Sequence, residues 1–211
     1  MNRFFYIVLF LLCGAARAYA QERAVGAFIP AGYDTLTVAR GDLNNDGKED
    51  VAIVLYSTME NQDSINVDSI PPRLLIILFK TPNGYIEAAK SSTAILCKDC
   101  LMNAFQGMEI ENGILNIEHY GGVNLKWAAT HHFQFLKNDF YLIGQNIWSF
   151  KINAYCNKLD EFKGNTENIN FITGEYHREK ISENCKRTKS SGKQAVKPLV
   201  PLSKFDINNN Y

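Results

Sequence analysis

The sequence predicts an all-β protein: a single-domain, curved antiparallel meander that is sandwich-like or an incomplete propeller-like array. Three observations lead to this fold class: short runs of alternating or β-branched apolar residues, hairpin-type turn sequences between them, and no long helical period. Of the 211 residues, 46% are hydrophobic and 21% are charged, which excludes a disordered chain. We expect about eight strands.

Two apolar runs in the first half of the chain are expected to form strands that are buried on both faces. Residues 51–56 read VAIVLY and residues 73–80 read RLLIILFK, which are continuous rather than alternating patterns. Upstream, Leu36 and Val38 alternate with threonines, as is typical of a half-buried strand.

Three turn sequences predict hairpins between the later strands. They are Pro82-Asn83-Gly84, Asn112-Gly113 and Lys137-Asn138-Asp139. Asn-Gly is the strongest of these signals because both residues tolerate the positive φ angles of a tight hairpin turn. Beyond Ile152 the pattern weakens, and the residues become polar and then basic.

The first 20 residues are interpreted as a signal peptide. Arg3 supplies a positive start, residues 4–12 are apolar, and Ala18-Tyr19-Ala20 suits cleavage before Gln21. The alternatives are a membrane anchor and a lipoprotein that uses Cys13. The apolar run is shorter than the roughly 20 residues that a membrane helix needs, and Leu12 is not the small residue usual before a lipoprotein cysteine. We therefore expect a periplasmic or secreted protein with no membrane span after cleavage.

The mature chain is expected to have two parts. Residues 21–155 would form the β-sheet domain, and residues 156–211 would form a polar segment that is tied by a disulfide and ends in an extended tail. Cleavage removes two basic residues and no acidic ones, so 20 basic and 22 acidic residues are left, a net charge near −2. This charge argues against nucleic acid as a partner.

Four cysteines are left after cleavage: Cys97, Cys100, Cys156 and Cys185. An even number in an oxidising compartment suggests two disulfides. Nearness in sequence favours Cys97–Cys100 and Cys156–Cys185. The Cys97-x-x-Cys100 spacing also allows an alternative function, a thiol-disulfide oxidoreductase, although such a pair normally begins a helix in a βαβ unit.

One acidic segment, residues 41–50 (GDLNNDGKED), carries the pattern of a calcium loop. Side-chain oxygens fall at alternate positions in Asp42, Asn44 and Asp46, and again in Asp50, while Lys48 offers its backbone carbonyl. Hard oxygen ligands in this order suit Ca²⁺, and Gly47 occupies the position of the sharp turn. The EF-hand pattern fails, because the twelfth position is not glutamate and the flanks read as strands.

The phrase Gly-Asp-Leu-Asn-Asn-Asp-Gly-Lys-Glu-Asp-Val-Ala-Ile-Val resembles one FG-GAP calcium-loop repeat of integrin-type β-propellers. The resemblance implies side-chain ligation of calcium by Asp42, Asn44, Asp46 and Asp50 and carbonyl ligation by Lys48. The motif occurs once, over about 25 residues, whereas a propeller stacks several blades. Residues 95–100 and 118–122 look like a family of exported bacterial proteins of unknown role that carry a single such turn.

A possible ligand surface is centred on His119, Tyr120 and Trp127, since an exposed tyrosine and tryptophan can stack on a sugar or a peptide. His119 with Glu118 would suit a hydrolase. His131-His132 could complete a zinc site with the cysteines, but neighbouring strand residues point to opposite faces.

The function expected from the sequence is that of an exported, non-catalytic β protein that is stabilised by calcium. It would present a binding surface to a macromolecule or a glycan. No sequence motif names a reaction, since the chain contains no nucleophile elbow, no phosphate loop and no zinc-protease helix.

Overall fold

The computed structural model describes residues 24–61, 69–98, 104–156 and 162–209. These residues form eleven strands and a few short 3₁₀ turns, so the predicted all-β class is confirmed. The strands are β1 (Tyr33–Gly41), β2 (Asp50–Ser57), β3 (Leu74–Thr81), β4 (Gly84–Ser91), β5 (Phe105–Glu111), β6 (Ile114–Gly121), β7 (Leu125–Leu136), β8 (Asp139–Tyr155), β9 (Phe162–Asn170), β10 (Glu175–Ile181) and β11 (Arg187–Lys193). The 3₁₀ turns are η1 (Val25–Phe28), η2 (Thr58–Asn61) and η4 (Leu202–Lys204). Within the described ranges, no helix has the length and apolarity to cross a bilayer.

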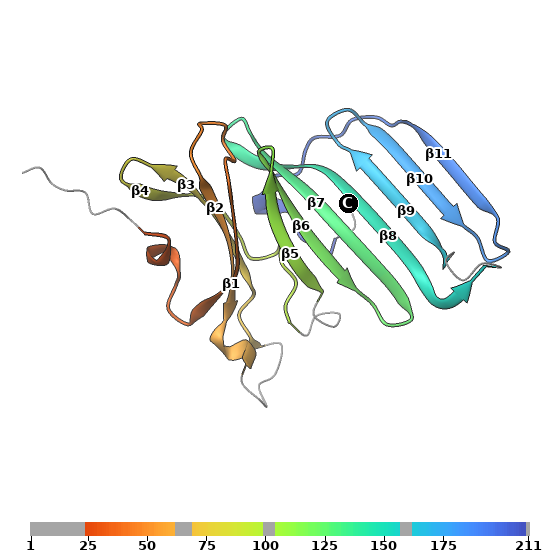
Figure 1. Ribbon diagram of the computed structural model, residues 1–211, viewed down its shortest axis with the longest axis horizontal. Coiled ribbons are helices and arrows are strands. Elements are labelled where there is room, and N and C mark those ends of the chain that lie inside the picture. Colours follow the sequence, from red (N-terminus) through yellow and green to blue (C-terminus); the bar gives the residue numbers. More distant parts are fainter. Residues whose placement is uncertain (1–23, 62–68, 99–103, 157–161, 210–211) are drawn as a thin grey trace, which may run out of the picture.

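The strands form two antiparallel sheets in which the chain moves from each strand to its neighbour. One sheet has the order β1-β2-β3-β4, and the other has the order β11-β10-β9-β8-β7-β6-β5. Figure 1 shows the seven-stranded sheet as a broad row of arrows, with the four-stranded sheet beside β5. Most neighbouring strands of each sheet are joined by a hairpin or a short loop, as is typical of a meander, whereas the connection from β2 to β3 is longer and spans residues 58–73.

A shared core joins the two sheets. It includes Val54 and Ile77 from the four-stranded sheet and Ile117, Phe133 and Leu142 from the seven-stranded sheet. This arrangement is the sandwich-like one of the two that the sequence allowed. The inner face is hereafter the face of the seven-stranded sheet that lines this core, and the outer face is the opposite one.

Strands β2 and β3 are buried on both faces, as their continuous apolar sequences predict. The residues that alternate with the shared core, such as Ile53 and Ile76, form a second cluster on the other side of the sheet. Val25, Phe28 and Ile29, in and next to η1, pack against that cluster. Burying all six residues of this second cluster removes a large apolar area from water, which stabilises the fold.

The three predicted hairpin turns are confirmed. Asn112 and Gly113 between β5 and β6 have φ angles of 52° and 76°. Lys137 and Asn138 between β7 and β8 have φ angles of 50° and 66°. Gly84 closes the turn between β3 and β4 with a φ of 101°. Positive φ at two consecutive positions is the geometry that keeps the twist of a tight hairpin.

The sequence pattern did not reveal strands β9, β10 and β11, which extend the seven-stranded sheet beyond the shared core. Every residue of β11 is exposed, and β9 has a single buried residue, Ile169. A strand without a buried face lacks the apolar alternation by which strands are recognised. The predicted boundary at residues 155/156 falls between β8 and β9, and the ladder of paired residues crosses it.

The C-terminal segment returns along the body of the protein. After β11, the carbonyl of Val200 accepts a hydrogen bond from the N–H of Leu142 (2.9 Å), and Pro201 bridges Tyr141 of β8. Leu202 and Phe205 then enter the shared core and are almost fully buried. The segment from 194 to 200 has no regular secondary structure, as expected from Pro198 and from Pro201 directly after it.

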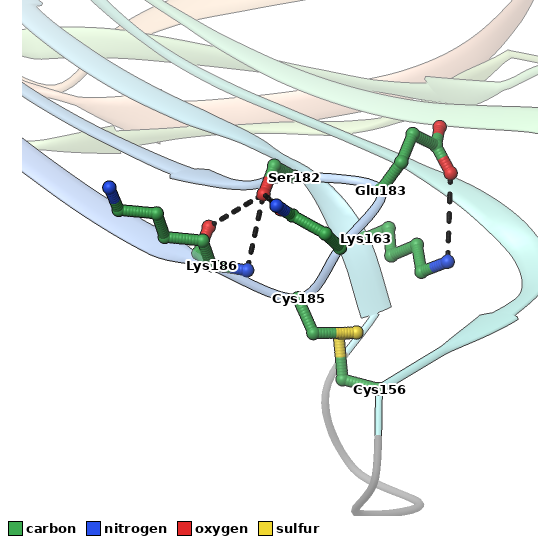
Figure 2. The surroundings of a disulfide bond; sticks show 7 residues. Cys156, Lys163, Ser182, Glu183, Cys185 and Lys186 are labelled. Carbon is green, nitrogen blue, oxygen red and sulfur yellow. Dashed lines mark hydrogen bonds and ion pairs between the residues drawn. A yellow bond between two sulfur atoms is a disulfide. The ribbon is translucent and has the colours of Figure 1, made fainter.

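The predicted disulfide between Cys156 and Cys185 is present, and it ties the end of β8 to the connection between β10 and β11 (Figure 2). Its two Cα atoms are 5.5 Å apart. Beside it, the carboxylate of Glu183 forms ion pairs with the ammonium groups of Lys151 (2.7 Å) and Lys163 (3.6 Å). The bond therefore joins the ends of strands in the part of the sheet that extends beyond the shared core.

Replacing both cysteines, in C156A/C185A, should lower the free energy of unfolding by about 3–4 kcal/mol, because the disulfide closes a chain segment of 29 residues. Urea denaturation measures this loss. Under native conditions, amide hydrogen exchange should accelerate in β9–β11 through local opening, whereas the most protected amides of β1–β4, which exchange through global unfolding, should accelerate only in proportion to the measured loss of stability. Equal stability and uniform exchange would show that the disulfide does not restrain this part of the sheet.

Candidate functional site

The acidic loop connects β1 to β2 and is built around two left-handed residues. Asn45 has a φ of 60° and Gly47 a φ of 78°. No heavy atom lies within 4 Å of a Cβ placed on Gly47, so the backbone conformation alone calls for glycine there. These two residues reverse the direction of the chain within the loop. As a result, the side chains of Asp42, Asn44 and Asp46 lie next to the backbone N–H groups of residues 46–48.

Hydrogen bonds show how these side chains converge. The N–H of Asp46 lies 3.1 Å from Oδ1 of Asp42 and 3.0 Å from Oδ1 of Asn44. The N–H of Gly47 donates to the other oxygen of Asp42 (2.8 Å). The Lys48 ammonium lies 2.8 Å from Oδ2 of Asp46, and this contact lowers the pKa of Asp46. The oxygens of three predicted ligands therefore face into one loop.

Asp50 lies at the buried end of the loop. It is fully buried, and its two oxygens accept hydrogen bonds from the N–H groups of Leu43 and Lys80, each at 2.9 Å. Burial raises the pKa of this carboxyl, and the charge of Asp46 raises it further, although the backbone donors act in the opposite direction. A second negative charge beside a buried carboxylate is an arrangement that a cation would stabilise.

The donors fit calcium only if amide and carbonyl oxygens are counted. No group of three or more His, Cys, Asp or Glu side chains in the described ranges is placed to hold a metal. A ligand set would therefore combine the carboxylates of Asp42 and Asp46 with the amide of Asn44 and the carbonyl of Lys48. Asp50 is less available as a ligand, because backbone N–H groups of Leu43, Lys80 and Asn44 all donate to its carboxylate.

The acidic loop also joins the two sheets. Leu43 is fully buried in the shared core. On the other side, a Cβ placed on Gly113, in the turn between β5 and β6, would lie 3.4 Å from Oδ1 of Asn45. A loop that touches the core, β3 and the β5–β6 turn affects the stability of the whole sandwich when its own conformation changes.

The structure does not bring His119, Tyr120 and Trp127 to one surface. His119 is buried on the inner face, where its Nε2 accepts a hydrogen bond from the N–H of Leu96 (3.4 Å). Trp127 lies on the same face and is half-buried, whereas Tyr120 is on the outer face. Glu118 is also on the outer face, so the carboxylate and imidazole of the hydrolase alternative point in opposite directions.

His131 and His132 also separate, as the alternation of a strand predicts. His131 is buried on the inner face, 4.9 Å from the ring of Phe205. His132 is half-buried on the outer face, where its Nδ1 lies 2.7 Å from Oδ1 of Asn116. Cys97 is disulfide-bonded, while Cys100 lies outside the described residues, and so do residues 1–20.

The outer face carries the exposed aromatic residues of the seven-stranded sheet. Tyr120 is 36% exposed, Trp148 is 39% exposed and Tyr155 is 43% exposed. Trp148 packs on Phe150 with 4.3 Å between ring centroids, and Tyr155 packs on Phe162 at 4.7 Å. The Lys126 ammonium lies 5.5 Å from the centre of the Tyr120 ring. Exposed aromatic side chains on an uncovered sheet are typical of a binding surface.

Polar side chains lie beside these aromatics around a depression of about 370 Å³. The lining includes His132, Asn146, Asn168, Asn170 and His177. Gly144 lies beneath it, and a Cβ at this position would come within 2.9 Å of the carbonyl oxygen of Ile169 and 3.6 Å of the His132 ring. The site thus offers amide and imidazole groups that can both donate and accept hydrogen bonds.

Sequence reasoning identified Tyr120 but missed Trp148 and the asparagines. The sequence carried little signal for the asparagines, because Asn168 and Asn170 alternate with one apolar residue, Ile169, and one charged residue, Glu167, so the segment has no continuous apolar face. Comparison with protein-family models, with curated proteins and with solved structures finds no match to this chain.

His119 and His131 should make the protein sensitive to acid. Burial, the charge of His131 and that of Arg73 lower the pKa of His119 to about 3. Burial, followed by the charge of His132, lowers the pKa of His131 to about 4. Because both pKa values are depressed in the folded state, the unfolded state binds these protons at a higher pH than the folded state does. The protein is therefore most stable with respect to these groups above pH 6.5, and its free energy of unfolding decreases as the pH falls toward 4 and then 3.

When the pH is lowered from 7 to 5, each of the two buried histidines should therefore decrease the free energy of unfolding by about 2 kcal/mol. Urea denaturation across this range measures the slope. H131F, which keeps an aromatic ring beside Phe205, should remove about half of it, whereas H177A on the outer face should leave it unchanged. An unchanged slope in H131F would show that His131 does not titrate on unfolding.

Proposed function

We propose that this is an exported, non-enzymatic protein that is stabilised by calcium and binds a macromolecule or a glycan on the outer face of its long sheet. The observation that carries the proposal is the exposure of Tyr120, Trp148 and Tyr155 on the outer face, beside a polar depression. Aromatic side chains of this kind supply apolar contact area with little loss of conformational freedom.

Export is supported by the predicted signal peptide and is compatible with the disulfide between Cys156 and Cys185. In a bacterial host that secretes through the general pathway, mass spectrometry of the mature protein should find Gln21 at its N-terminus. Protein recovered from the cytoplasm with Met1 intact would contradict export.

The calcium part of the proposal rests on the acidic loop. Side-chain oxygens of Asp42 and Asn44 accept hydrogen bonds from the N–H of Asp46, and Asp50 is fully buried at the end of the same loop. Bound Ca²⁺ would offset the charges of the three carboxylates, and Lys48 would supply a carbonyl oxygen. Because the loop contacts both sheets, this ion would act on the stability of the whole domain and would have no part in a reaction.

Adding calcium at 100 times its dissociation constant should raise the unfolding free energy by about 2.7 kcal/mol and the melting temperature by roughly 5–10 °C. Thermal melts with calcium and with chelator measure this change, and calorimetry measures the heat of binding. D42N/D46N should lose the shift. D34N, which changes an exposed aspartate of β1, should retain it. Identical melts of the wild type in calcium and in chelator would refute calcium binding.

The binding part of the proposal is tested with polymers of the bacterial envelope. Wild-type protein should bind saturably to at least one of peptidoglycan, lipopolysaccharide, a neutral polysaccharide or purified envelope proteins. Y120A/W148A should bind at least tenfold more weakly, since removing a central aromatic anchor costs about 2 kcal/mol. L36A, which truncates an exposed apolar residue of β1, is the matched control. Unaltered binding by Y120A/W148A would place the function elsewhere on the molecule.

A further inference from the structure

A straight row of hydrogen-bonding side chains crosses the outer face. Asn146 of β8 pairs with Asn168 of β9, Asn168 pairs with His177 of β10, and His177 pairs with Ser191 of β11. Directly paired residues project from the same face of a sheet. With neighbouring strands about 4.8 Å apart, these four side chains form a row roughly 14 Å long that runs perpendicular to the strands.

A second row, with two exposed aromatic residues, runs parallel to the first. Tyr120 of β6 pairs with Ala128 of β7, Ala128 pairs with Trp148 of β8, and Trp148 pairs with Thr166 of β9. The two aromatic residues are thus two strands apart, roughly 9.6 Å, with only the methyl group of Ala128 between them. Trp148 lies two residues beyond Asn146, so the rows are about 7 Å apart.

The basic residues of this face are already engaged. Lys126 bonds the carbonyl of Gly122 (2.7 Å), Lys189 pairs with Glu179 (3.1 Å), and Lys193 pairs with Glu175 (3.2 Å). Arg187 also pairs with Glu179. An anionic polymer would therefore find no free cation cluster in the described part of this face, while Glu118 of β6 would repel it. The face complements an uncharged ligand that is rich in hydroxyl groups.

The side chains around the depression are held in place by the fold. The bond between His132 and Asn116, which in turn donates to Glu109 (3.3 Å), fixes the imidazole beside the depression. Burial lowers the pKa of His132, which favours the neutral ring that can also accept a hydrogen bond. Asn168 is exposed, and its strand is hydrogen-bonded on both sides.

We infer that the outer face binds a linear, neutral polysaccharide that lies across strands β6 to β10. Sugar rings stack on Trp148 and Tyr120, and hydroxyl groups bond the side chains of Asn146, Asn168 and His177. A pyranose unit is about as long as one inter-strand spacing, so the two aromatic rings meet alternate sugars of the chain. This inference rests on the proposed binding role of the outer face and names its ligand class.

Calorimetry with neutral linear oligosaccharides of increasing length tests this inference, using β-glucan, xylan, mannan and chitin series. At least one series should bind, and its affinity should rise with length until both aromatic residues are covered. W148A should weaken binding of every length at least tenfold. Y120A should remove only the gain with length, which an indirect effect on folding would not do.

N168A provides a second variant that does not disturb the aromatic packing, and it should weaken binding several-fold. I86A, which truncates an exposed residue of β4, should bind as the wild type does. If the protein binds only an anionic polymer or a protein, with loss in W148A, the glycan inference is overturned while the outer face keeps its binding role. If no polymer binds, or if Y120A/W148A binds as well as the wild type, both proposals are overturned.

Discussion

Strands β2 and β3 must be covered on both faces, and the rest of the architecture follows from this constraint. Their apolar residues leave no side that could face water. Strands β5–β8 and the C-terminal residues Leu202 and Phe205 cover one face, while the segment around η1 covers the other. The four-stranded sheet is therefore the centre of three layers. The seven-stranded sheet forms an outside layer, and Tyr120, Trp148 and Tyr155 are exposed on its outer face.

The acidic loop lies where this apolar centre meets solvent. Asp50 begins β2 and is fully buried, yet it is charged when ionised, so its carboxylate needs partners. The N–H groups of Leu43 and Lys80 supply them from the loop and from the end of β3. The same carboxylate thus fixes the loop to two neighbouring strands.

Local sequence was sufficient for most of the first eight strands. The pattern at 51–56 and the turn at Asn112-Gly113 each contain the physical reason for their structure within a few residues. The pairing of Cys156 with Cys185 was also predictable because those cysteines are neighbours in sequence. Strands β9–β11 were not predictable in this way. Backbone hydrogen bonds to neighbouring strands hold them in the sheet, and their sequences show no apolar face.

The ligand surface needed information that no single segment holds. Trp127 and Trp148 are both aromatic residues of long strands, but only the register of β7 with β8 places Trp148 beside Ala128 and on the outer face. His119 and Tyr120 are adjacent in sequence, so alternation alone separates a buried imidazole from an exposed phenol. The asparagines come from different strands, and their alignment exists only once β8, β9 and β10 have paired.

The pairing of the strands also determines how firmly each part of the outer face is held. Strands β6 and β8 are hydrogen-bonded on both sides, so Tyr120 and Trp148 are held on backbone that a ligand does not need to order. Strand β11 is paired on one side only and is exposed at every position, so Ser191 is held less firmly. Contacts over β6–β9 thus cost less ordering entropy than contacts at the edge. A ligand that crosses the sheet would gain most of its affinity there, and its chain could extend past β11 without tight contact.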